Sequence, residues 1–210
     1  MPDGGDSGDN PTPPEPVTLD RTKILVSSVA GYVSHANQVK TIIENVEATA
    51  EVKIYEGSFQ AAVQYALGNG YAIVNRSTTG LTDYDETAGA DMIDAGGIAV
   101  HAHGSNTYEE LSNYANDQSI IGVRDSDGSY GTGVTFTIDE PLVSGVHEES
   151  WSTPQIAGYM TKYGIAFPSL SYTVILNTII ANASNGGVRN LITGYGTPDW
   201  DATETALGLL

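Results

Sequence analysis

Short apolar runs alternate with helical segments over residues 23–138, and this alternation limits the folds that the chain can adopt. The strand-like runs are residues 23–28, 51–55, 71–75, 97–102, 120–123 and 134–138. Helical patterns lie between the first four of them, at residues 35–48, 59–67 and 84–94. Strands that are separated by single helices pair in parallel through right-handed crossovers. We therefore expect a three-layer α/β fold, with a mostly parallel sheet and helices on both faces.

Two more helices are expected toward the C-terminus. Thr153 followed by Pro154 is typical of a helix start, with the hydroxyl as N-cap and proline at the first helical position. That helix would continue through Tyr163, and a second one would run from Tyr172 to Ala183.

The net charge of the chain limits the kinds of partner that it can bind. Asp and Glu number 26 against 8 Lys and Arg, which gives a formal net charge of −18. Nucleic-acid binding depends on cationic side chains that replace counterions, so this balance argues against it, and it also argues against docking on an anionic membrane. Cysteine is absent, which excludes disulfides and thiolate ligands. No apolar run is long enough to span a membrane.

The first residues differ in composition from the rest. The sequence from Met1 to Pro16, MPDGGDSGDNPTPPEP, has too few apolar side chains to fold alone. It also lacks the basic start and apolar stretch of a signal peptide, and we expect a soluble protein. We predict a flexible N-terminal arm over residues 1–20 and a folded domain over residues 21–210. The arm is expected to contact other protein subunits of an assembly.

A recognisable motif surrounds Ser150. The sequence there reads EESWSTPQIAG, and Pro168 follows in the turn before the next helix. This stretch resembles the nucleophile helix of the subtilisin (S8) serine proteases. In that family the pattern Gly-Thr-Ser-x-Ala-Thr-Pro-x-Val-Ala-Gly is followed by a helix, a Pro-containing turn and another helix. The resemblance implies that Ser150 stands at the position of the nucleophile.

Other segments resemble the same family in the same order along the chain. The sequence HANQV at His35 is similar to the start of the helix that bears the catalytic histidine. The run GIAVHAHGSN ends at Asn106 and is similar to the strand that leads to the oxyanion-hole asparagine. An ungapped count favours Asn106 for that role, although Ser105 directly follows the glycine, as the asparagine would. The collinear order over residues 23–210 implies a subtilisin-like fold, reduced in size.

Two departures from the family pattern bear on catalysis. The first strand should end in the catalytic aspartate, but Ser28 stands there, and Glu148-Glu149 replaces the Gly-Thr before the nucleophile. A serine nucleophile needs a histidine base, and a carboxylate must hold that base in the correct tautomer. Loss of this carboxylate typically lowers turnover ~10⁴-fold. The two glutamates also disfavour the negative charge that develops near the nucleophile in the transition state. Glu149 is, however, an alternative partner for His35. The resemblance therefore implies a degenerate member with a vestigial site.

His101 and His103 are two residues apart on one predicted strand, so both would point to one face. A metal site would need a third ligand such as His147, and we favour a pair of partly buried polar side chains instead. The turn at residues 125–128 lacks the spaced ligands and closing glutamate of a calcium loop. We expect no metal and no cofactor.

Three functions remain open from the sequence. We favour a pseudoprotease that serves as a structural or binding component of a larger assembly, and a virion is the setting we expect. The alternative is a minimal subtilisin-like serine endopeptidase that uses Ser150, His35 and Asn106. A third function is the binding of a peptide or glycan, without cleavage, in the cleft that corresponds to the active site of the family.

Overall fold

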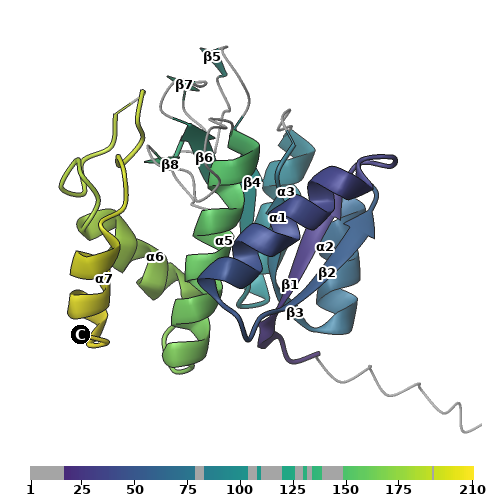
Figure 1. Ribbon diagram of the computed structural model, residues 1–210, viewed down its shortest axis with the longest axis horizontal. Helices are drawn as coiled ribbons and strands as arrows, with labels where there is room; N and C mark the ends of the chain where they lie inside the picture. The colour runs from purple at the N-terminus through teal and green to yellow at the C-terminus, as the bar shows by residue number, and fades with distance from the viewer. Residues whose placement is uncertain are drawn as a thin grey trace, which may run out of the picture.

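Figure 1 shows the computed structural model, in which a central sheet lies between layers of helices. The structure describes residues 17–78, 83–103, 108–109, 120–125, 130–131, 134–138, 149–190 and 192–210. The strands of the main sheet are β1 (Asp20–Ser28), β2 (Glu51–Glu56), β3 (Tyr71–Arg76), β4 (Ile98–Ala102), β6 (Ile120–Asp125) and β8 (Phe136–Ile138). The helices are α1 (Val33–Val46), α2 (Phe59–Asn69), α3 (Asp83–Asp94), α5 (Glu149–Ala166), α6 (Tyr172–Ala181) and α7 (Trp200–Leu207). Strands β5 (Tyr108–Glu109) and β7 (Tyr130–Gly131) pair separately.

The main sheet is parallel throughout, with strand order β2-β1-β3-β4-β6-β8. This confirms the expected fold class. The chain passes from β1 outward to β2, returns to β3 on the other side of β1, and then continues in one direction. The order therefore reverses between β1 and β3. In open α/β sheets, ligand sites lie beyond the carboxyl ends of the strands at such a reversal.

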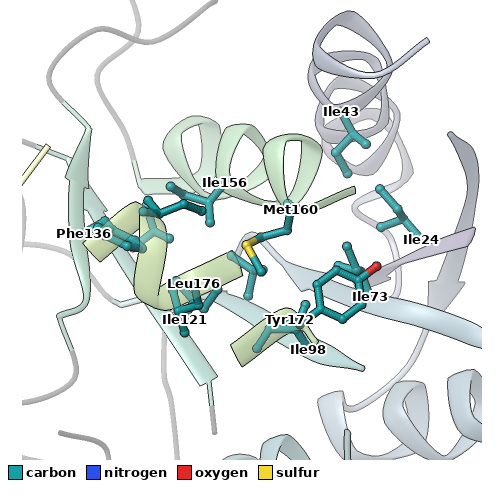
Figure 2. Packing of buried hydrophobic residues seen from close by; sticks show 14 of the residues in the cluster. Ile24, Ile43, Ile73, Ile98, Ile121, Phe136, Ile156, Met160, Tyr172 and Leu176 are labelled. Carbon is teal, nitrogen blue, oxygen red and sulfur yellow. The ribbon is translucent and has the colours of Figure 1, made fainter. Parts of the chain in front are cut away.

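The helices cover both faces of the sheet. Helices α1 and α5 lie against one face, and α2 and α3 lie against the other. Figure 2 shows the larger core, where Ile24, Ile73 and Ile98 of the strands meet Met160 of α5. A second core on the opposite face is built around Phe59 and other side chains of α2 and α3. Because helices cover both faces, the inner strands β1, β3 and β4 read as nearly continuous apolar runs, whereas the edge strand β2 is partly exposed.

A close contact between α1 and α5 sets the positions of two candidate site residues. Helix α1 carries His35 and α5 carries Ser150. Gly158 of α5 faces Val46 of α1, and a Cβ atom added at Gly158 would lie 2.7 Å from the Val46 Cβ atom. The two helices can approach this closely only because Gly158 has no side chain.

The start of α5 differs from the sequence prediction. The prediction that a helix starts at Thr153–Pro154 is wrong, because α5 begins at Glu149 and Pro154 lies inside it. Proline lacks the N–H that would bond to the carbonyl of Ser150, four residues earlier, so one hydrogen bond near the helix end is missing. The loss falls close to the N-terminus, where the helix tolerates it.

The division into an arm over residues 1–20 and a domain over residues 21–210 stays a prediction. Strand β1 begins at Asp20, whose N–H donates to the Gly70 carbonyl oxygen at 2.7 Å. The predicted arm falls mostly on residues 1–16, which lie outside the described residues. In the part of the chain that the structure describes, no helix is both long and apolar enough to cross a membrane.

Candidate active site

A cleft of about 420 Å³ opens where the strand order reverses. It lies beyond the carboxyl ends of β1 and β3 and beside the first turns of α1 and α5. The described residues that line it are Val29, Tyr32, His35, Arg76, Ser77, Thr78 and Ser150. The topology of the sheet therefore brings together residues that are far apart in the sequence.

His35 is the third residue of α1, and its imidazole faces the end of β3. The Nε2 atom lies 3.0 Å from the carbonyl oxygen of Ser77. A carbonyl oxygen only accepts hydrogen bonds, so this contact is a hydrogen bond in the tautomer that carries the proton on Nε2. The ring of Trp151 packs against the imidazole, with ring centroids 4.9 Å apart and planes at 58°.

Ser150 is the second residue of α5, and its hydroxyl donates to the same carbonyl. The distance from Ser150 Oγ to the Ser77 oxygen is 2.9 Å. Ser150 Oγ and His35 Nε2 are thus separated by no more than two hydrogen-bond lengths. Each of them donates to Ser77 rather than one donating to the other.

Ser28 ends β1 and does not contact the imidazole through a hydrogen bond. Its side chain is 3 % exposed, and its hydroxyl donates to the adjacent Val29 carbonyl oxygen at 3.3 Å. A small void between Ser28 and His35 is too narrow to admit a water molecule. Nothing in this position supplies the negative charge that an aspartate would bring.

No carboxylate forms an ion pair with His35 within the described ranges. The ion pairs found there are Lys40–Glu44 and Lys162–Glu204, and none of these residues lines the cleft. The side chain of Glu149, the alternative partner, is not among those described. Asn106 and Ser105, the two candidates for the oxyanion hole, also lie outside the described residues.

His101 and His103 are more deeply buried than expected. Both have 0 % exposure, whereas the sequence predicted partial burial. His101 Nδ1 donates to the Ala102 carbonyl oxygen at 2.7 Å, and its ring meets the ring of Phe59 edge-on at 5.3 Å. Burial lowers the pKa of His101 to about 3 and that of His103 to about 4, so both are neutral at pH 7. Among the described residues, no three His, Cys, Asp or Glu side chains gather as a metal site.

Sequence reasoning did not single out Val29, Tyr32, Arg76, Ser77 and Thr78 of the lining, nor Trp151 beside it. Ser77 supplies the carbonyl at its centre, Arg76 supplies a guanidinium group, and Trp151 holds the imidazole. A contact through a backbone carbonyl has no residue-type signature. The available signal was positional, because Arg76 and Ser77 end the strand that neighbours β1.

Comparison with known proteins supports the fold. No family model and no curated protein matches the chain. Solved structures do match it. The prenylagaramide maturation protease PagA has a TM-score of 0.66 and 14 % identity, over 90 % of this chain and 95 % of that chain. A mutant of the protease domain of PatA has a TM-score of 0.69 and 11 % identity, over 91 % and 97 %.

A third match comes from the Antarctic psychrotroph Pseudoalteromonas sp. AS-11. Its psychrophilic subtilisin-like protease Apa1 has a TM-score of 0.67 and 12 % identity, over 92 % of each chain. Identities this low leave the activity open. The strand order, the placement of His35 and Ser150, and these matches together show that the chain has a subtilisin-like fold.

Proposed function

We propose that the chain is a catalytically impaired subtilisin-like domain, a pseudoprotease, that serves as a binding or structural component of a larger assembly. The observation that carries this proposal is the shared contact at Ser77. A general base must present a free lone pair to the serine hydroxyl. In its Nε2–H tautomer, His35 instead donates a hydrogen bond to the Ser77 carbonyl oxygen, and the Ser150 hydroxyl donates to the same atom.

The absence of an aspartate at Ser28 gives this arrangement a physical cause. In an active triad, the carboxylate accepts from Nδ1–H and so leaves Nε2 free to accept from the serine. Ser28 carries no charge and bonds to its own neighbour, Val29. The imidazole is then free to place its proton on Nε2, where the Ser77 carbonyl stabilises it.

The role in an assembly rests on features of the sequence. The arm over residues 1–20 is rich in proline, and proline lowers the entropy that an extended segment loses when it lies along a neighbouring subunit. A virion is the setting that we propose for this assembly. Sedimentation velocity of the full chain and of a chain without the arm tests the role, with weaker association expected after truncation.

A second candidate, a minimal endopeptidase, is favoured by one observation. His35 and Ser150 lie at one cleft, with Ser150 Oγ and His35 Nε2 no more than two hydrogen-bond lengths apart. The three matching structures described above are all proteases by name. This candidate would use Ser150 as nucleophile, His35 as base and Asn106 in the oxyanion hole.

Labelling with a serine-directed fluorophosphonate separates the two candidates. The full chain should show no labelling above that of the Ser150→Ala variant. Ser28→Asp should increase labelling at Ser150. Ser28→Asn should not, because asparagine has nearly the same shape as aspartate but carries no charge. Strong labelling of the unmodified chain that disappears in Ser150→Ala would identify a working protease and reject the pseudoprotease.

A further inference from the structure

Strand β2 lies at the edge of the main sheet, and one of its faces is only partly covered (Figure 1). Helix α2 lies over β3 and β1 more than over β2. Lys53 and Tyr55 are on the face of β2 that is turned toward α2, since both contact Tyr65 of that helix. Lys53 is exposed and Tyr55 is half-buried. This face of β2 is therefore accessible to a partner.

Three tyrosine rings form a row from this face of β2 to the first residue of β3. The ring centroids of Tyr55 and Tyr65 are 5.0 Å apart, and those of Tyr65 and Tyr71 are 6.1 Å apart. Lys53 Nζ lies 4.8 Å from the centroid of the Tyr65 ring, and Lys23 Nζ lies 5.9 Å from that of the Tyr71 ring. The tyrosine row, made of these three residues, thus has two ammonium groups beside it.

Both ammonium groups can take a carboxylate from a partner. Within the described ranges, neither Lys23 nor Lys53 forms an ion pair. Asp20 lies near Lys23, and Glu51 lies near Lys53, without pairing with them. Lys53 donates a hydrogen bond to the Tyr65 hydroxyl, which raises the pKa of Lys53 and keeps it charged at neutral pH. Aromatic rings suit proline side chains, and exposed ammonium groups suit carboxylates, so the row fits a proline-rich acidic segment.

The predicted arm has this complementary chemistry. Residues 11–16 read PTPPEP, and residues 1–16 contain four Asp or Glu and no Lys or Arg. Prolines three positions apart, such as Pro13 and Pro16, lie on one side of a polyproline II helix, which has three residues per turn. That helix rises about 3.1 Å per residue, so about four residues extend as far as the tyrosine row. Proline-rich segments of this kind bind aromatic surfaces.

The path of the chain favours the arm of a second copy over the chain's own arm. A Cβ atom added at Gly70, the residue before β3, would lie 3.6 Å from Val17 Cγ1, so the chain enters the domain at one end of the row. From there β1 runs alongside the row to its other end, where Ser27 pairs with Tyr55. The chain's own residues 11–16 would have to reverse direction at once to follow the row. Their prolines fix φ and restrict the residues before them, which disfavours a tight reversal.

We propose that the tyrosine row of one subunit binds residues 11–16 of a second copy of the chain. The prolines pack on Tyr55 and Tyr65, and the carboxylate of Glu15 pairs with Lys53. Each subunit carries one arm and one row, so every copy both gives and receives a contact. The inference rests on the proposed function, because it names the surface that receives the arm in the assembly.

An exchange of two charges tests this contact in sedimentation velocity of the full chain. Lys53→Glu and Glu15→Lys should each weaken self-association about fivefold, the size expected for an exposed ion pair. The double variant, and a one-to-one mixture of the two single variants, should recover most of the association, because both pair opposite charges again. Lys40→Glu makes the same charge change on α1, where Lys40 pairs with Glu44, and should leave association unchanged.

Fluorescence anisotropy adds a test that needs no variant of the protein. A labelled peptide of residues 1–17 should bind the full chain, and an excess of unlabelled peptide should dissociate its assemblies. A second peptide, with alanine in place of the four prolines of PTPPEP, keeps every charge. It should bind at least about fivefold more weakly, because it loses both the proline contacts and the pre-formed extended shape.

Three results would overturn the inference. They are equal binding of the two peptides, single charge variants that associate like the unmodified chain, and recovery in the double variant without recovery on mixing. The last result would place the arm on its own domain. Removal of residues 1–17 separates this inference from the proposed function. If truncation weakens association and the charge exchanges do not, only the inference fails. If truncation leaves association unchanged, the proposed role of the arm in an assembly fails.

Discussion

Gly158→Ala is expected to destabilise the fold through the contact between α1 and α5. The new Cβ atom would lie 2.7 Å from the Val46 Cβ atom, and both atoms are fixed to helix backbones. Ordinary carbon contacts are about 3.5–4.0 Å, so the helices would have to separate by about 1 Å. Overpacking of this kind typically costs about 1–3 kcal/mol.

Gly68→Ala is the matched control for this change. Gly68 also lies in a helix, α2, but a Cβ atom there would meet nothing within 4 Å. Alanine in place of glycine inside a helix stabilises it by about 0.5–1 kcal/mol, and both variants gain this stabilisation. The difference between the two free energies of unfolding therefore isolates the packing cost, about 1–3 kcal/mol.

Urea unfolding and thermal melting measure this difference. Each kcal/mol should shift the melting temperature by about 2–4 °C in a domain of this size, downward from Gly68→Ala to Gly158→Ala. Equal stabilisation by both substitutions would refute the close approach of α1 and α5, and with it the packing that positions His35 and Ser150.

Two further predictions concern acidity and the N-terminal arm. The buried neutral histidines should make the protein acid-sensitive. In the folded state His101 and His103 have pKa values of about 3 and about 4. Below about pH 6.5 these histidines therefore bind protons in the unfolded chain but not in the folded one. Stability should therefore fall by up to roughly 1.4 kcal/mol per pH unit for each histidine. In urea unfolding between pH 7 and pH 5, His101→Gln should show a shallower fall than the unmodified chain, and an unchanged slope would contradict the assignment. Deletion of residues 1–17, most of the predicted arm, should leave the melting temperature nearly unchanged while weakening association in sedimentation velocity. A truncated chain that unfolds, or a full chain that is monomeric at all concentrations, would count against the arm as an assembly element.

The fold could largely be predicted from the sequence because the inner strands β1, β3 and β4 are buried on both faces over most of their length. The runs at β1, β3 and β4 are apolar for that reason, and their spacing leaves room for one helix each. The order of the strands did not follow from these patterns alone. The resemblance implied a subtilisin-like fold, and it rests on short motifs that follow the family's order along the chain.

Only part of the site could be predicted from the sequence. His35 and Ser150 are residue types that a motif can mark, and the structure places them at one cleft. The Ser77 carbonyl is a backbone atom, and the anchoring of Arg76 depends on Ser27 and Gly57, which come from other strands or loops. Tertiary contacts of this kind leave no local pattern. The start of α5 was misjudged for a similar reason, because packing extends the helix past a proline that local rules place at its first turn.

The tautomer of His35 tests the central claim most directly. Nitrogen-15 NMR of the imidazoles is practical because the chain has only 4 histidines, and His35→Gln assigns the relevant signals. His101 gives an internal contrast, since its Nδ1 donates to the Ala102 carbonyl. At a pH where His35 is neutral, we predict a proton on Nε2 of His35, in the hydrogen bond to Ser77. A proton on Nδ1, with Nε2 accepting from Ser150, would contradict the pseudoprotease and restore the arrangement of an active base.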